Sequence, residues 1–460
     1  MRGRGRQQRG IHSPAMTQPT QMRTFLPPSA ADLFLRDLEQ RAEHPDAAST
    51  IGAVLHLSGT VPELSDLQEY VAARLPHLPC LTYLLHGDGR QAQWVPVVPD
   101  PAHHVGARRV PRGPEALEAA VQELMGVPWP EGVPAWRLVL LHGHVPDGFA
   151  LLYLTHHAVQ DGGTIVAVLE SFFGPDSPAE RPAPVARTRS VEPRPGMRQL
   201  WRSAAILLRH ARKHHVWTSP ARPLSSRRRM SWAHVPVTWL KAAARAGGAG
   251  INDVYLTALG HAIAGWASAA WPRAARAPIP VMVPVSLRTA DEWAAPGNRL
   301  FLTRVDLPGG LPPLARRLAD TSAVTAAFRL PGHRAVLRAA LTRLPPGLLG
   351  RLVAVSTAPG RLTLAASFLV MRKRLRYGDA AVNRIDPVMC CPPGAPLAVV
   401  LLVYAGEASL CFRIDEALPG ADTLPGLWRQ ALVELSTAGR PMISPGAVTA
   451  AGAAPPRGGL

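Results

Sequence analysis

Apolar and polar positions follow two alternating patterns along this chain. Short apolar runs that are typical of strands are separated by segments in which apolar residues recur at helical spacing. In the first half, the predicted strands are 50–57, 93–98, 136–142 and 149–155, and the predicted helices are 30–39, 67–74 and 114–125. This mixture predicts one α/β domain over residues 23–175, with an antiparallel or mixed sheet.

The second half of the chain has the same mixture of elements. Its predicted strands are 231–237, 279–286, 298–307, 398–404 and 408–414, and its predicted helices are 238–246, 254–270, 313–329, 334–355 and 424–436. A second α/β domain is therefore expected over residues 231–444. Two halves of similar size and content indicate a duplicated architecture, although no internal repeat in the sequence proves it.

The segments outside these two domains lack such periodicity. Residues 1–22 and 445–460 are expected to be disordered, and residues 176–230 are expected to form a linker that includes a basic amphipathic helix at 197–217. That helix could lie on an anionic membrane surface or pack against its own domain. Both interpretations remain open from the sequence.

Composition narrows the class of function. The formal net charge of +18 suggests an anionic partner, but lysine occurs only at Lys213, Lys241 and Lys373, and the other cations are arginines. Abundant Ala, Gly, Pro and Arg are typical of a GC-rich coding bias, and no nucleic-acid signature is present, so no nucleic-acid partner is expected.

The cysteine content and the hydropathy of the chain indicate the cellular compartment of the protein. The four cysteines have neither metal-ligand spacing nor the density of a disulfide scaffold, which predicts no metal site and a reducing environment. No uncharged apolar run reaches the length of about 18 residues that a membrane span requires. We therefore expect a cytoplasmic protein, either free or attached peripherally to the inner face of the membrane.

The candidate chemistry lies in the run LLYLTHHAVQDGGTIVAVLESFF, residues 151–173, which reads as strand, sharp turn and helix. Two adjacent histidines, His156 and His157, end the strand. Asp161 stands where a helix N-terminus favours a carboxylate, and Gly162 allows a close approach of other groups. A turn of this kind can hold an imidazole in a fixed place, as a general base requires.

The motif HHAVQDG resembles the HHxxxDG motif of the chloramphenicol-acetyltransferase-like superfamily, which includes non-ribosomal peptide condensation domains. Further blocks, in order, resemble the bacterial wax ester synthase/diacylglycerol acyltransferases. These blocks are RRRMSWAHVPVTWLKAAARAGGAGINDVYLTAL, PVMVPVSLRTADEWAAPGNRLFLTRVDLP and NRIDPVMCCPPGAPLAVVLLVYAGE. The resemblance extends from about Phe25 to Glu434.

This resemblance implies an α/β fold of the α+β sandwich kind, with two chloramphenicol-acetyltransferase-like domains and a tunnel between them. It implies that His157 is the general base and that Asp161 is a structural carboxylate, while His156 supports the turn. The superfamily commonly pairs that aspartate with an arginine from the second domain, and Arg288 in PVSLR is the candidate.

Three further residues carry open interpretations. Asn298, in GNR, is expected near the tunnel floor, either in a binding role or a structural one. Asn252 and Asp253 read as a helix cap, with substrate binding as the alternative. One departure leaves the substrate open: where the family usually has a SNVPGP-like run, this chain reads SFLVMRKRLRYG from Ser367.

The resemblance implies acyl transfer from a thioester, acyl-CoA, to a long-chain alcohol or diacylglycerol, with no cofactor and with a membrane or lipid-droplet surface as a potential partner. The first alternative is a stand-alone condensation-type enzyme that joins an acyl group, carried on a carrier protein, to an amine or alcohol. The second is a paralogue that keeps the fold without catalysis.

Overall fold

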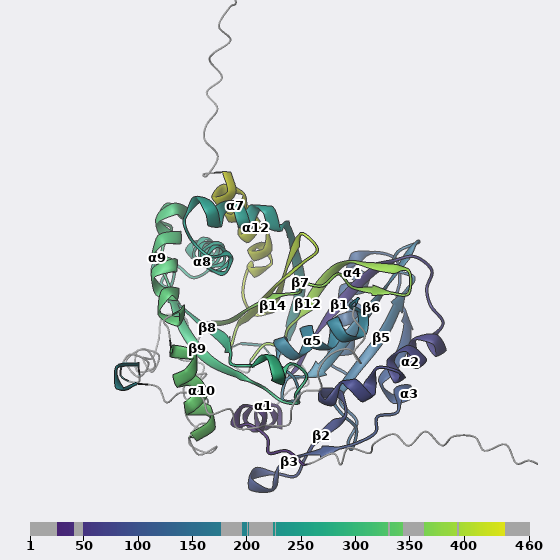
Figure 1. Cartoon of the computed structure of the whole chain (residues 1–460). Coiled ribbons are helices and arrows are strands. Elements are labelled where there is room, and N and C mark those ends of the chain that lie inside the picture. The colour runs from purple at the N-terminus through teal and green to yellow at the C-terminus, as the bar shows by residue number, and fades with distance from the viewer. Residues whose placement is uncertain are drawn as a thin grey trace, which may run out of the picture.

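The computed structural model describes residues 25–40, 49–175, 196–199, 201, 224–225, 227–329, 332–343, 363–392 and 395–437. Most of its strands form two six-stranded sheets (Figure 1). The first sheet has the order β11 (Arg376–Tyr377), β12 (Ala380–Val388), β1 (Thr50–Ser58), β6 (Gly148–His156), β5 (Trp136–His142) and β4 (Val105–Arg109). Only β4 and β5 run parallel, so the sheet is mixed, as expected.

Helices cover both faces of the first sheet because β1 and β6 are apolar almost throughout. One face packs against α2 (Leu64–Ala72) and α5 (Gly162–Phe173), and the other against α4 (Pro114–Met125). Alternate residues of β1 point to opposite faces, so Leu55 joins the core under α5 while Val54 joins the core under α4. The strand before the two histidines is therefore held from both sides.

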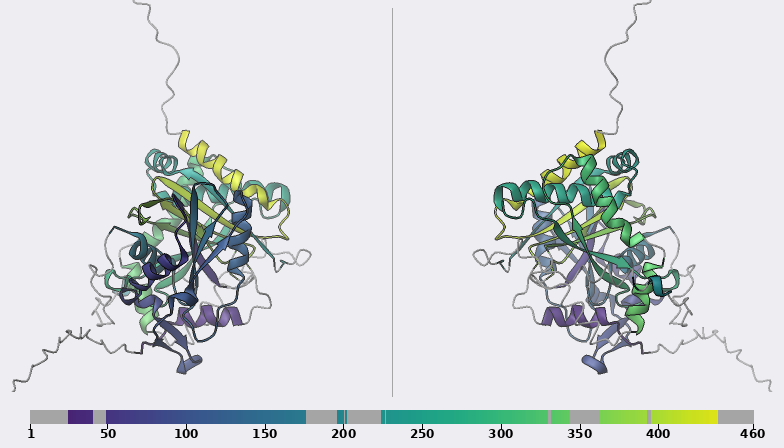
Figure 2. Two further views of the ribbon diagram at one scale, coloured as in Figure 1. Left: turned by 90° about the vertical axis from the view of Figure 1, so that its right-hand side faces the viewer. Right: turned by 90° about the vertical axis from the view of Figure 1, so that its left-hand side faces the viewer.

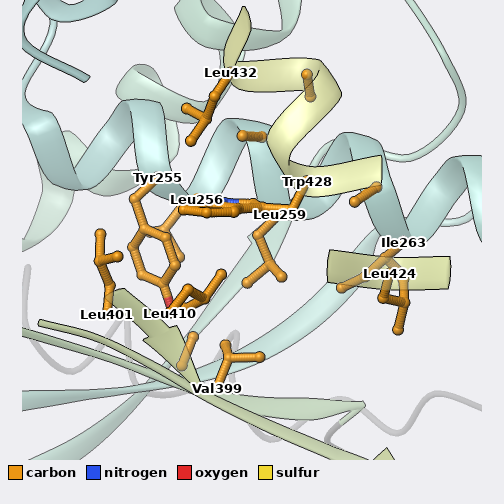
Figure 3. Close-up of a cluster of buried hydrophobic side chains, with 14 of the residues drawn as sticks. Tyr255, Leu256, Leu259, Ile263, Val399, Leu401, Leu410, Leu424, Trp428 and Leu432 are labelled. Carbon is orange, nitrogen blue, oxygen red and sulfur yellow. The ribbon is translucent and has the colours of Figure 1, made fainter. Parts of the chain in front are cut away.

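The second sheet has the order β7 (Arg228–Pro236), β14 (Glu407–Asp415), β13 (Leu397–Tyr404), β10 (Leu364–Val370), β8 (Ile279–Ser286) and β9 (Leu300–Leu307). One face is covered by α7 (Val237–Ala246), α8 (Ile251–Ala270), α9 (Leu314–Ala326) and α12 (Leu424–Thr437) (Figure 1). Figure 2 shows α12, in yellow, at the outer end of the molecule in both views. Trp428 of α12 lies among Tyr255 and Leu259 of α8 and Leu401 of the sheet (Figure 3).

The remaining described elements are shorter or lie at the margin. They are α1 (Ala30–Gln40), the pair β2 (Tyr83–His86) and β3 (Gln93–Pro96), α3 (Pro101–His104) and α10 (His333–Arg343). None of the helices in the described ranges has the length and hydropathy needed to cross a membrane.

Most predicted elements are present, with small shifts at their ends. The predicted strand at 298–307 begins at Leu300, and the predicted helix at 254–270 begins earlier, at Ile251. Strands β2, β4, β10, β11 and β12 were not predicted. The predicted helix at 197–217 lies largely outside the described residues, as do both termini, most of the linker and residues 344–355.

The second half contributes a strand to the first sheet, which the sequence did not indicate. Strand β12 pairs antiparallel with β1, with Asp386 opposite Val54, although it lies more than 300 positions later in the chain. The division into continuous domains at 23–175 and 231–444 is therefore wrong for residues 376–388, which are strands of the first sheet. Tyr404 of β13 donates its hydroxyl hydrogen to the carbonyl of Val382, and this ties β12 to the second sheet at 3.0 Å.

Asp386 of β12 is the buried polar residue that connects the two sheets. Nε2 of His56, from β1, lies 2.7 Å from one of its carboxylate oxygens, and Nε2 of His234, from β7, lies 2.7 Å from the other. Ser409 of β14 also donates to Asp386, at 2.7 Å. Burial raises the pKa of this carboxyl, but the bonds from His234 and His56 outweigh burial and hold the pKa well below its ordinary value of 3.8.

We expect the Asp386→Asn substitution to destabilise the fold by about 3 kcal/mol, because the half-buried His56 and His234 and the buried Ser409 lose a charged partner. Chemical unfolding monitored by circular dichroism measures the change. The folded pKa of Asp386 is depressed, so its contribution is present above the unfolded pKa of about 3.8 and is lost as pH falls. The difference from wild type should therefore shrink in acid. Asp379→Ala, which breaks an exposed pair with Arg376, is the control and should change stability by less than about 1 kcal/mol.

Candidate active site at the turn after strand β6

The candidate site is built on the turn of residues 156–161, which we call the histidine turn. Strand β6 ends at His156 and α5 begins at Gly162. The main-chain N–H of His156 donates to Ala135 at 3.0 Å, and its ring Nδ1 accepts from the N–H of Ala158 at 2.9 Å. The ring of His156 thus braces the turn.

His157 has a different environment from its neighbour. Its main-chain N–H donates to Ser49 at 2.6 Å, and its carbonyl accepts from Nδ2 of Asn298 at 2.8 Å. Within the described chain, the buried ring Nδ1 makes no hydrogen bond of ordinary geometry, while the residue as a whole is partly exposed. Burial lowers the pKa of His157 below 6.5, so the ring is neutral near pH 7. A neutral imidazole that reaches solvent can accept a proton.

Asp161 caps helix α5 and joins the two halves of the molecule. Its Oδ1 accepts from the main-chain N–H and hydroxyl of Thr164, at 2.8 and 3.0 Å. Its Oδ2 accepts from Nη2 of Arg288 at 2.9 Å and from the main-chain N–H of Arg299 at 2.8 Å. Burial raises the pKa of Asp161, but the charge of Arg288 and these hydrogen bonds outweigh it and hold the pKa at about 2.

Arg288 is the expected arginine from the second half, and it is buried together with its partner. The exposed fractions of the side chains are 7% for Arg288 and 5% for Asp161. The guanidinium also donates to the carbonyls of Glu292, Ala295 and Gly297, which belong to its own loop. Arg288 therefore shapes the loop of residues 287–299 and fastens it to the histidine turn.

Several main-chain contacts complete this fastening. The N–H of Gly297 donates to Val159 at 2.7 Å, and Gln160 forms a parallel bridge with Gly297. Gly297 has a φ of +82°, and a Cβ there would lie 2.5 Å from Oδ2 of Asp32. Only glycine fits both the backbone conformation and the space.

Asn298 has a structural role in this site, which is one of the two alternatives that the sequence left open. It is 2% exposed. Its Nδ2 donates to the carbonyls of His157 and Ala158, at 2.8 and 3.1 Å, and to Oδ1 of Asp32 at 3.0 Å. The amide thus fixes the main chain on which His157 is carried.

Asp32 is a site residue that sequence reasoning missed. It lies on α1, is fully buried, and accepts from the main-chain N–H of Asn298 at 2.6 Å. Burial raises its pKa above 3.8. The spacing of Ser29 and Asp32, which exchange hydrogen bonds at the start of α1, is a sequence signal for a helix cap. That signal does not reveal the partner, which lies 266 residues later in the chain.

Gly162 lies against a strand of the second half. A Cβ on Gly162 would be 2.9 Å from a methyl group of Leu369, in β10.

Asn252 and Asp253 lie apart from the histidine turn, at the start of α8. Asp253 caps that helix through the N–H of Gly250 and pairs with Arg329, both at 3.0 Å, which favours the cap over a substrate ligand. In the described ranges, no group of three potential ligand side chains is arranged to hold a metal ion.

We expect Arg288→Ala to destabilise the fold by about 3 kcal/mol, since the substitution leaves the Asp161 carboxylate buried without its cation. Urea unfolding at neutral pH measures this change. The pKa of Asp161 should also rise above about 2, so the stabilisation that its ionised form gives is lost at a higher pH on acidification than in wild type. Arg288→Lys keeps the charge and should recover part of the stability. If Arg288→Ala is as stable as wild type, the ion pair does not join the halves.

The chain is similar to known acyltransferases. Residues 29–216 match the family model described as the wax ester synthase/diacylglycerol acyltransferase catalytic domain. The probable diacylglycerol O-acyltransferase Tgs4 of Mycobacterium tuberculosis is 24% identical over 399 residues, which cover 75% of this chain and 83% of the relative. A putative diacylglycerol O-acyltransferase of the same species is 28% identical over 244 residues, which cover 50% of this chain and 52% of the relative.

Solved structures show the same fold. The wax ester synthase/diacylglycerol acyltransferase of Marinobacter aquaeolei is similar with a TM-score of 0.60 at 16% identity, over 88% of this chain and 98% of that chain. The starter condensation domain of rhizomide synthetase is similar with a TM-score of 0.63 at 14% identity, over 90% and 94% of the two chains. Residues 29–216 thus match the catalytic domain of the wax ester synthase/diacylglycerol acyltransferases, and the fold is shared with such an enzyme and with peptide condensation domains.

Proposed function

We propose that the protein transfers an acyl group from acyl-CoA to the hydroxyl of a long-chain alcohol or diacylglycerol, with His157 as the general base. The observation that carries this proposal is that His157 combines a fixed main chain with a neutral, partly exposed ring. Its ring is neutral because burial lowers its pKa, and its main chain is fixed by Ser49 and Asn298. The relatives named as diacylglycerol O-acyltransferases support an alcohol as the acceptor.

The reaction needs one base and two aligned substrates. Because Nδ1 of His157 is buried, Nε2 is the nitrogen that takes the proton from the acceptor hydroxyl. The hydroxyl oxygen attacks the thioester carbonyl carbon, a tetrahedral intermediate forms, and the carbon–sulfur bond breaks. The leaving thiolate then takes the proton back from Nε2, so His157 returns to its neutral form. A positioned base contributes about 10²–10⁴-fold to the rate.

A substrate panel tests the function. We expect ester formation from palmitoyl-CoA with hexadecanol or diacylglycerol, and a loss of about 10²–10⁴-fold in kcat/KM for His157→Ala without a change in thermal stability. His77→Ala, at an exposed position, is the matched control and should keep full activity.

Two results would contradict the proposal. If only carrier-bound acyl groups react, and only with amines, the protein is a condensation-type enzyme. If the wild-type protein turns over no acyl thioester while it remains folded, it is a non-catalytic member of the family.

The pH dependence gives an independent check on the base. Because burial lowers the pKa of His157, the acid limb of kcat/KM should have its midpoint below 6.5, with activity lost as pH falls through it. The sign follows from the mechanism, since only the neutral ring can accept the proton. A midpoint clearly above 6.5, measured with saturating alcohol and varied acyl-CoA, would contradict the assignment of His157 as a buried neutral base.

A further inference from the structure

Strand β10 continues into an exposed cationic segment that the proposed reaction does not use. We call residues 371–377 the basic strap; they join β10 to β11. Four of the five residues from 372 to 376 are cationic: Arg372, Lys373, Arg374 and Arg376. The three arginines are exposed and Lys373 is partly exposed. This is the run in which the chain departs from the pattern of the family it resembles.

The strap is fixed to the fold by residues that alternate with its arginines. Met371 and Leu375 are buried, at 4% and 2% exposure. The N–H of Met371 donates to Val403 at 3.0 Å, and the N–H of Leu375 donates to the hydroxyl of Tyr404 at 2.9 Å. The intervening arginines are therefore held outward by a rigid main chain, and binding an anion there would order little more of the protein.

The strap starts beside the histidine turn and follows helix α5. Leu369, two residues before it, lies against Gly162, the first residue of that helix. The main-chain N–H groups of Arg372 and Lys373 lie 3.3 and 3.5 Å from a carboxylate oxygen of Glu170, eight residues further along α5. At 1.5 Å per residue this places the first cations about 12 Å from the turn. Figure 1 shows α5 at the junction of the two halves.

Two arginines of the strap have no acidic partner in the described part of the chain, since no carboxylate lies within ion-pair distance of the side chains of Arg372 and Arg374. Arg376 pairs with the exposed Asp379 at 3.0 Å, and the Glu170 carboxylate lies at the main chain of Arg372 and Lys373. Arg74, two residues after α2, adds another cation, because it is stacked at 3.5 Å on the ring of Tyr70, and Tyr377 at the end of the strap contacts the same ring.

We propose that Arg372 and Arg374 bind a phosphate group of the thioester donor while its acyl carbonyl lies at His157. The inference rests on the proposed function. In CoA and in the prosthetic arm of a carrier protein, a flexible pantetheine chain separates the sulfur from the nearest phosphate. A phosphate subsite must therefore lie well away from the base, as the strap does. The planar guanidinium group bonds phosphate oxygens in pairs, which suits two adjacent exposed arginines.

The test compares donors with and without phosphate. The variant Arg372→Ala/Arg374→Ala is set against a control of equal charge, Arg245→Ala/Arg273→Ala, at exposed positions of the second half. We expect the Kd of CoA from titration calorimetry to rise about tenfold or more in the strap variant and to stay unchanged in the control. The KM for palmitoyl-CoA should rise likewise, while the KM for palmitoyl-pantetheine, which has no phosphate, should not change.

An acyl-carrier protein as donor identifies the source of the phosphate. If the strap variant weakens the reaction of the acyl-carrier but not the binding of CoA, the same phosphate contact serves a carrier, and the inference holds with that donor. Unchanged binding of both donors overturns it. So does an equal loss with palmitoyl-pantetheine, which indicates a distorted site. Loss of binding only to phosphatidylserine vesicles also overturns it and assigns the strap to an anionic membrane.

The binding measurement separates this inference from the proposed function. If CoA binding depends on the two arginines but the protein transfers no acyl group, the phosphate subsite is supported and the proposed function is contradicted. Acyl transfer that is insensitive to the two arginines with both CoA and the acyl-carrier as donors keeps the function and overturns the subsite.

Discussion

The buried ion pair between Asp161 and Arg288 is the contact on which the candidate site depends. A buried charge is tolerated only when its partners replace the water that it loses. Asp161 meets that condition because it accepts four hydrogen bonds. The two terminal nitrogens of Arg288 donate to three carbonyls besides the carboxylate, and only its buried Nε lacks a partner among the described residues. The partners come from both halves of the chain, 127 residues apart. The histidine turn therefore has its observed shape only when both halves are assembled.

The position of His157, the proposed base, depends on this arrangement and not on contacts of its own ring. The main chain of His157 is fixed by Ser49 from the first half and Asn298 from the second. Asn298 is in turn held by Asp32 on the N-terminal helix. The imidazole is left neutral and partly exposed, which suits proton transfer. The main chain of His157 is thus held rigidly while its ring stays available, because the hydrogen bonds from Ser49 and Asn298 are made to the main chain and not to the ring.

Strand β12 comes from the second half but belongs to the first sheet, and this explains how two separate sheets can keep the residues of one site in fixed positions. Asp386 joins His56 of the first sheet to His234 of the second, and Leu369 of β10 packs on Gly162 at the start of α5. The second half thus reaches the first through a strand, a buried carboxylate and the loop 287–299. Acyl transfer needs two substrates aligned with one base, and effective molarity is lost when such groups shift by even about 1 Å. Several independent links between the halves limit that shift.

The sequence by itself determined the mixed α/β content, the turn between β6 and α5, and the two histidines with their aspartate, because these depend on short-range periodicity and turn chemistry. Through the resemblance it also led to Arg288 and Asn298. Only the tertiary structure decided that Asp32 supports Asn298, that β12 belongs to the first sheet, and that the strap 371–377 lies along α5. Strand β12 has the mixed sequence AAVNRIDPV, in which the polar residue Asp386 is buried by partners from distant strands. Local pattern reports the propensity of a segment, whereas pairing across more than 300 residues depends on which surfaces the folded halves bring together.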